Sequence, residues 1–108
     1  MITCTSYKEG NKTFYNIQLN DNGTDVSITR EIVGTLSRAE FLACIEGLEL
    51  AKSFKWKKGF PVYVTSKAVL IHSKDVSSLT RSELFRAACV LHLLIEETGA
   101  KIILQNSH

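Results

Sequence analysis

The sequence has few cysteines and no long apolar run. Its three cysteines, Cys4, Cys44 and Cys89, lie far apart and form no Cys-x-x-Cys pair, which gives no support to a disulfide framework or a zinc knuckle. We interpret them as small core residues. The apolar runs are much shorter than the roughly 20 residues of a membrane-spanning helix. The first residues also lack a secretory signal, so we expect a soluble, cytoplasmic protein.

Motifs of several enzyme classes are missing as well. The chain contains no glycine-rich phosphate loop and no Gly-x-Ser-x-Gly elbow, so nucleotide hydrolysis and acyl transfer have no support. The three histidines, His72, His92 and His108, do not show the spacing of metal ligands. We therefore expect no cofactor and no bound metal ion.

The composition is that of one compact unit. The chain has 108 residues, of which 44% are hydrophobic and 22% charged, and this predicts a single domain over 1–108. The formal net charge of +2 is compatible with an anionic partner but does not require one.

The first third of the chain shows the two-residue period of β-strands. Residues 1–7 and 13–19 alternate between apolar and polar and are separated by turn residues, which predicts a hairpin. A second turn signal at 20–23 precedes another alternating segment that ends at 33. Three antiparallel strands are therefore expected first.

The rest of the chain alternates helical and strand patterns. Ser37-x-x-Glu40 is a capping box before a helix from about Arg38 to Phe54, and Thr80-x-x-Glu83 is a second one before a helix that ends at Gly99. Between the helices, residues 61–65 predict a strand covered on both faces and parallel to the first strand. Residues 67–74 are either a short helix or a turn that carries Val69, Leu70 and Ile71 into the core. Residues 101–105 form a last strand, giving an α/β fold of order βββαβαβ.

The segment Thr35–Ala51 reads TLSRAEFLACIEGLELA. It resembles the first helix of the ribonuclease H-like superfamily, where a Thr-Asn-Asn-Arg-Ala-Glu-Leu start precedes a stretch rich in alanine and leucine. The predicted element order is also similar to that superfamily. The resemblance implies a ribonuclease H-like mixed sheet, with three antiparallel strands followed by parallel strands and helices.

The resemblance also points to an altered active site. Active members of the superfamily hold two divalent metal ions with several carboxylates, which neutralise the attacking and leaving oxygens of phosphodiester hydrolysis. Glu40 stands at the position of the helix glutamate, but Cys4 and Ser66 stand where two aspartates are expected. The superfamily's last helix, which brings a further acid, has no counterpart before His108.

One carboxylate is too few for hard cations that take six or more oxygen ligands. We therefore expect a non-catalytic binding or assembly module in which Glu40 serves as the capping-box acid. The alternative is a metal-dependent nuclease acting on RNA or a DNA–RNA hybrid, with acids completed by a partner subunit. Other acids of this chain are not expected to complete the metal site, because they lie in turn-like or unassigned sequence. These acids are Asp21, Asp25 and Asp75.

A cluster of lysines surrounds the single tryptophan at the end of the first predicted helix. Its members are Lys52, Lys55, Trp56, Lys57 and Lys58. Lysines bind phosphates and tryptophan can stack on a base, so DNA or RNA is one candidate partner. The structural alternative is that the lysines favour the helix C-terminus while Phe54 and Trp56 cover the edge of the core.

The last strand suggests a second kind of partner. Without a final helix, apolar surface around Ile102, Ile103 and Leu104 should be open. An open edge can pair with a second copy or accept an element of another protein, so a homodimer or a protein partner is expected here. The alternative is that the helix over 80–98 packs over this surface.

Overall fold

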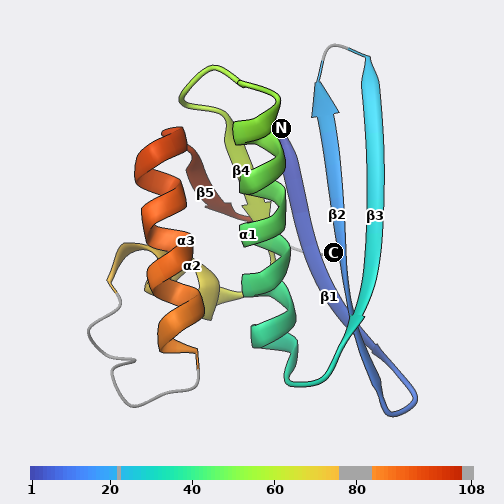
Figure 1. The fold of residues 1–108 in the computed structure, drawn as a ribbon. Helices are drawn as coiled ribbons and strands as arrows, with labels where there is room; N and C mark the ends of the chain where they lie inside the picture. The colour runs from blue at the N-terminus through green and yellow to red at the C-terminus, as the bar shows by residue number, and fades with distance from the viewer. Residues whose placement is uncertain (22, 76–83, 106–108) are drawn as a thin grey trace.

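The computed structural model describes residues 1–21, 23–75 and 84–105 (Figure 1). Their strands are β1 (Ile2–Glu9), β2 (Lys12–Asp21), β3 (Thr24–Ile32), β4 (Pro61–Val64) and β5 (Lys101–Leu104). Their helices are α1 (Leu36–Ser53), α2 (Lys67–Lys74) and α3 (Phe85–Thr98). The strands form one sheet in the order β3-β2-β1-β4-β5, in which β1, β2 and β3 are antiparallel and β4 and β5 run parallel to β1. The predicted α/β class and mixed sheet are confirmed, with α2 as an additional helix.

The helices pack on one face of the sheet (Figure 1). Apolar residues of β1 and β2 alternate toward this face, where Ile2 and Cys4 are paired with Leu19 and Ile17 and all four are buried. Helix α1 lies close to these strands because Gly47 has no side chain. A Cβ atom at Gly47 would lie 3.1 Å from the Ile2 Cγ2 atom. The sequence therefore brings α1 against the centre of the sheet.

The start of α1 differs from the prediction. The N-cap residue is Thr35, whose Oγ1 accepts a hydrogen bond of 3.1 Å from the Arg38 backbone N–H. Ser37 already lies in the first turn, so the predicted capping box of Ser37 and Glu40 is wrong. The physical reason is that the Glu40 side chain points into the interior, where its carboxylate accepts hydrogen bonds from the backbone N–H groups that follow β4.

Two further predictions change in detail. Strand β4 is not covered on both faces: Val62 and Val64 are buried, whereas Pro61 and Tyr63 are only half-buried. The ambiguous segment forms α2, which carries Val69 into the core but leaves Ile71 57% exposed. The second predicted capping box, residues 80–83, lies outside the described residues.

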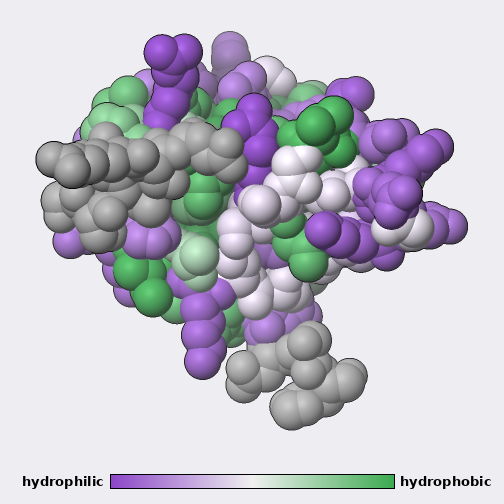
Figure 2. Space-filling view, turned by 90° about the horizontal axis from the view of Figure 1, so that it is seen from below, coloured by the Kyte–Doolittle hydropathy of each residue, from purple (hydrophilic) through white to green (hydrophobic). Residues whose placement is uncertain are grey.

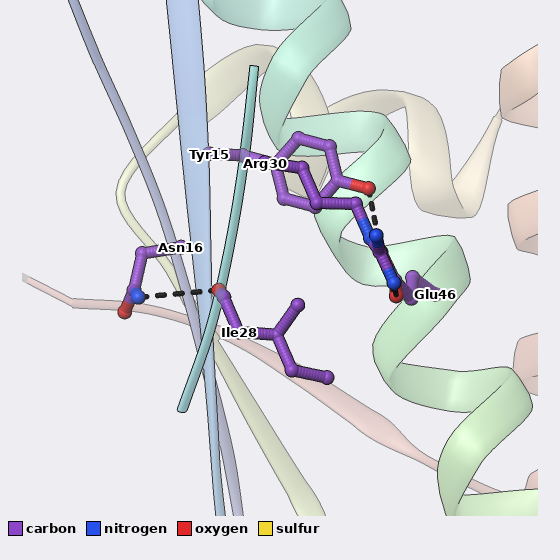
Figure 3. Close-up of polar contacts among 5 residues, drawn as sticks. All are labelled: Tyr15, Asn16, Ile28, Arg30 and Glu46. Atoms are coloured by element: carbon purple, nitrogen blue, oxygen red, sulfur yellow. Dashed lines mark hydrogen bonds and ion pairs between the residues drawn. The ribbon is translucent and has the colours of Figure 1, made fainter. Parts of the chain in front are cut away.

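A polar network connects β2 and β3 to α1 (Figure 3). Glu46 accepts a 2.5 Å hydrogen bond from the Tyr15 hydroxyl and three hydrogen bonds from the Arg30 guanidinium, at 2.7, 2.7 and 2.9 Å. The hydrogen bonds from Arg30 hold the pKa of Glu46 below its usual value, and burial followed by the bond to Glu46 raises the pKa of Tyr15 to about 12. The network fixes β2 and β3 against the middle of α1.

The helices in the described ranges are too short or too polar to cross a membrane.

Candidate functional site

The candidate site centres on Glu40, whose side chain is fully buried. Its Oε2 atom accepts hydrogen bonds from the backbone N–H groups of Thr65 (3.1 Å) and Ser66 (2.5 Å). Its Oε1 atom accepts a 2.5 Å bond from the Thr65 hydroxyl and a longer one of 3.5 Å from the Ser6 hydroxyl. All hydrogen-bond partners of this carboxylate in the described structure are therefore neutral donors.

The topology of the sheet brings these groups together. Strands β1 and β4 are parallel neighbours whose last paired residues are Cys4 and Val64, where β4 ends and β1 continues to Glu9. Ser6 and Ser66 each lie two residues beyond this last pair. Ser66 is also the N-cap of α2, where its hydroxyl oxygen accepts from the Val69 N–H. The Glu40 carboxylate thus faces the start of α2.

The residue of β1 that is hydrogen-bonded to Glu40 is Ser6. Cys4 lies deeper in the core, is fully buried and is hydrogen-bonded to Cys44. That hydrogen bond, together with burial, raises the pKa of the Cys44 thiol well above its usual value, which keeps this thiol neutral in the core. Because strand side chains alternate, Cys4 and Ser6 lie on the same face of the sheet, and the assignment of Cys4 to the position of the first aspartate stays a prediction.

The donor set does not fit a pair of divalent cations. Within the ranges that the structure describes, no three histidine, cysteine, aspartate or glutamate side chains gather as a metal site requires. Asp21 ends β2 and Asp25 pairs with Asn20, both in the β2–β3 hairpin, and Asp75 follows the end of α2. The site therefore offers one carboxylate, with hydroxyl and backbone N–H groups around it.

Figure 2 shows the lower end of the molecule, where the β1–β2 turn and the start of α1 lie. Near-neutral residues (white) occupy the middle of this face, and hydrophilic residues (purple) gather on the side of the β1–β2 turn. The surface at this end thus shows mixed polarity rather than one continuous apolar patch.

The predicted lysine cluster lies at the other end of α1, in the segment 54–60, which we call the aromatic–lysine loop. Glu40 and Phe54 are separated by about 21 Å along the helix, at about 1.5 Å per residue. Lys57 and Lys58 are exposed, whereas Lys52 forms an ion pair with Glu97 of α3. The structure therefore keeps four of the five cluster residues on the loop and places Lys52 in a helix–helix contact.

The loop begins with a strained backbone. Phe54 caps α1, and the next residue, Lys55, adopts a left-handed conformation with φ 58°. The backbone N–H groups of Lys55 and Trp56 bond to the Lys52 and Ala51 carbonyls, which is the hydrogen-bond pattern of a Schellman C-cap. Glycine is the usual residue at this position, and a side chain there costs about 1–2 kcal/mol.

The aromatic residues of the loop divide into an inner and an outer group. Trp56 is half-buried and packs edge-on against Phe60, with ring centroids 5.2 Å apart, so it is less exposed than the sequence suggested. Phe54 is 57% exposed. Phe54 and Trp56 line two adjoining hollows of about 410 and 220 Å³, and Asp21 borders both. The structural interpretation thus holds for Trp56 but not for Phe54.

The predicted interface on β5 is smaller than expected. Ile102 and Leu104 point toward the helices and pack against the core, which agrees with partial cover from the helical layer. Only Ile103 points to the opposite face, where it is 39% exposed beside Tyr63. The predicted apolar surface therefore reduces to one isoleucine on an edge strand.

No protein-family model and no curated protein matches the chain. Solved structures do match it. The ribonuclease H1 of the halophilic archaeon Halobacterium salinarum superposes with a TM-score of 0.77 at 18% identity, over 96% of this chain and 83% of that one. LC11-RNase H1 in complex with an RNA/DNA hybrid gives 0.78 at 17% identity, over 96% and 83%. The N-terminal RNase H domain of a Mycobacterium tuberculosis protein gives 0.71 at 16%, over 96% and 82%.

The chain has a ribonuclease H-like fold. The expectation drawn from the helix Thr35–Ala51 is thereby confirmed for the architecture. Within the ribonuclease H-like fold, Glu40, Ser6 and Ser66 come together just beyond the last residue pair that joins β1 to β4.

A sequence signal for this arrangement is present. The dipeptide Thr-Ser occurs within β1 as Thr5-Ser6 and directly after β4 as Thr65-Ser66. Each dipeptide directly follows one residue of the last β1–β4 pair, Cys4 and Val64, so the two dipeptides lie side by side. This repeat points to Ser6 once the register between β1 and β4 is known.

Proposed function

We propose that this protein is a non-catalytic nucleic-acid-binding module built on a ribonuclease H-like fold. The observation that carries the proposal is the environment of Glu40. Its carboxylate is fully buried and accepts hydrogen bonds from two backbone N–H groups and two hydroxyls. To bind a cation, Glu40 would have to lose these bonds, and a buried N–H left without an acceptor costs about 1–3 kcal/mol.

The residues around Glu40 supply no compensation for that loss. Ser6, Thr65 and Ser66 offer neutral oxygens, and hydroxyl groups do not neutralise a pair of dications. The glutamate therefore serves to join α1 to the junction of β4 and α2. The scaffold is retained without the charge that metal-dependent phosphodiester cleavage requires.

The binding half of the proposal rests on the aromatic–lysine loop. Lys55, Lys57 and Lys58 are exposed beside Phe54 and Trp56, a combination that contacts phosphates and stacks on bases. One of the structurally similar proteins, LC11-RNase H1, was solved with an RNA/DNA hybrid, which makes nucleic acid a reasonable class of ligand to test. Because the loop lies at the far end of α1 from Glu40, binding there is separate from the candidate site.

Salt-dependent binding tests this function. Fluorescence anisotropy of labelled single strands, duplex DNA and a DNA–RNA hybrid should show binding that weakens steeply with salt. Replacing Lys55, Lys57 and Lys58 by alanine should reduce the slope of log K against log salt by about 2 to 3, at about 0.7–0.9 for each phosphate that is no longer neutralised. The matched control replaces three exposed lysines elsewhere, Lys8, Lys74 and Lys101, with the same change in net charge.

Two results would contradict the proposal. Equal effects of the two triple variants would mean that binding follows net charge and not the loop. Cleavage of RNA or hybrid that depends on magnesium or manganese and is abolished by Glu40→Gln would establish the nuclease alternative instead. The protein partner or homodimer at β5 stays a separate prediction, which concentration-dependent sedimentation without nucleic acid would test.

A further inference from the structure

The outer surface of the aromatic–lysine loop contains an aromatic ring without an aromatic neighbour. The ring contacts of the described residues are Tyr7 with Phe14 and Trp56 with Phe60, so neither face of Phe54 is covered by another ring. Phe54 is also 57% exposed, and it lines both hollows of the loop. A flat apolar ring that borders a hollow of about 410 Å³ is a surface on which a planar group can stack.

The charges around this ring are arranged for an anion with a polar base. Lys55 and Lys57 line the larger hollow together with Phe54, Trp56 and Phe60. Asp21 is the one carboxylate lining it, and no hydrogen bond or ion pair of its side chain is found in the described part of the chain. Lysines next to an aromatic ring suit a nucleotide, whose phosphates and base need different partners.

The backbone at Lys55 supports a role for its charge. Lys55 occupies a left-handed position, φ 58°, that glycine adopts without strain. Strained residues cluster at binding and catalytic sites, so an observed outlier supports a functional hypothesis. At this position a lysine is less favourable for the fold than glycine, but Lys55 lines the hollow beside Phe54.

We propose that the loop binds one unpaired nucleotide of a single-stranded nucleic acid, with the base stacked on Phe54 and the flanking phosphates on Lys55 and Lys57. This inference rests on the proposed function and specifies its ligand. A paired base in a duplex is stacked on its neighbours and does not present a free face, so the hollow selects single strands. Asp21 accepts a hydrogen bond from an exocyclic amino group, as acidic side chains do from cytosine, so the hollow favours bases that carry one.

The single tryptophan makes the binding directly measurable. Titration of the full chain with short oligo(dC), oligo(dT) and a duplex of the same length should change the fluorescence of Trp56, most strongly with oligo(dC). Phe54→Ala should weaken single-strand binding about tenfold, which corresponds to about 1.4 kcal/mol and lies within the range of stacking on one aromatic side chain. Duplex affinity should not change. The control is Leu93→Ala, because Leu93 on α3 has the same exposure of 57%.

A second variant separates binding from folding. Lys55→Gly should raise the urea midpoint, because glycine adopts the left-handed conformation freely, and should at the same time weaken single-strand binding severalfold. A residue with a merely structural role would not show these opposite changes.

The outcomes distinguish the inference from the proposed function. If wild type binds nucleic acid but Phe54→Ala binds single strands as well as wild type does, or weakens single strands and duplex equally, the stacking inference is overturned and the proposed function stands. If no nucleic acid binds at low salt, both are overturned. Tighter binding of oligo(dT) than of oligo(dC) would remove the role given to Asp21.

Discussion

The Glu40 carboxylate accepts a 2.5 Å hydrogen bond from the backbone N–H of Ser66, the residue that caps α2. This bond connects three elements at one point, because Glu40 belongs to α1 and Ser66 joins β4 to α2. A buried charge is tolerated only when it is fully hydrogen-bonded, and here backbone groups at a helix start provide two of the four donors. An acid at this position is therefore explained by the fold itself.

The first prediction concerns the stability that Glu40 supplies. Glu40→Gln can turn its amide oxygen to the backbone N–H groups and its N–H₂ group to the two hydroxyls, but it replaces hydrogen bonds to a charged group by weaker neutral ones. It should therefore destabilise the protein by about 2 kcal/mol. Urea unfolding should show a lower midpoint with an unchanged m-value. The control is Glu49→Gln on the exposed side of α1, which should change stability by less than about 0.5 kcal/mol. An equally stable Glu40→Gln protein would contradict the linking role.

The second prediction is that two added acids create a metal-binding site. Ser6→Asp combined with Ser66→Asp would place three carboxylates together, and aspartate keeps the N-cap of α2. The double variant should be less stable than wild type without metal, because like charges repel. Manganese at about 100 times its dissociation constant should stabilise it by about 2.7 kcal/mol. Wild type and the neutral Ser6→Asn, Ser66→Asn variant should show no manganese-dependent shift in Tm.

The third prediction is a pH dependence that arises from Glu46. The hydrogen bonds from Arg30 lower the pKa of Glu46 in the folded state, so the unfolded chain binds more protons in the acidic range. The stability that Glu46 contributes is therefore fully present above its ordinary carboxyl pKa and is lost as pH falls through the lowered value. Glu46→Gln should lower stability at neutral pH and flatten its decrease in acid. The exposed pair Lys12–Glu31 is the control, and Glu31→Gln should leave the acid limb unchanged.

Tyr15 in the same network gives an alkaline counterpart. Its pKa is raised to about 12 from the ordinary 10.0, first by burial and then by the hydrogen bond to Glu46. A raised pKa means that the contribution to stability is present below the ordinary value and is lost as pH rises through about 12. Spectroscopic titration of tyrosine ionisation should thus show one late group, which Tyr15→Phe removes.

The sequence predicted the elements well where their periods were long and clear. The alternation in β1 and β2 and the apolar stripe of α1 depend on burial of side chains against the core, and the structure follows both. The start of α1 was not predictable in the same way. Thr35 and Ser37 are both good cap residues, and the choice depends on where the buried Glu40 must lie, which is set by β4, far along the chain.

The site residues also depend on contacts between segments that are far apart in the sequence. The local motif around Glu40 identified the helix, but the residue of β1 that meets it depends on the register between β1 and β4, which no local pattern fixes. Cys4 and Ser6 lie on the same face, so alternation alone could not distinguish them. The lysine cluster was visible in the sequence, whereas the exposure of Phe54 and the pairing of Lys52 with Glu97 depend on how α1 packs beside α3.

The last prediction tests the anchoring of the aromatic–lysine loop. Gly99 ends α3 with φ 68°, and its carbonyl accepts a 3.0 Å hydrogen bond from the Gly59 N–H. A Cβ atom at Gly99 would lie 2.9 Å from the Lys58 Cβ atom, whereas one at Gly10, with a similar φ of 61°, would meet no atom within 4 Å.

Both alanine variants carry the cost of a left-handed side chain, about 1–2 kcal/mol, but only Gly99→Ala adds a steric clash. Gly99→Ala should therefore lower the unfolding free energy by about 1 kcal/mol or more beyond Gly10→Ala, the range of overpacking. It should also shift the fluorescence of Trp56, because the loop must move away from α3. Equal destabilisation with unchanged fluorescence would show that the contact between Gly99 and Lys58 does not hold the loop in place.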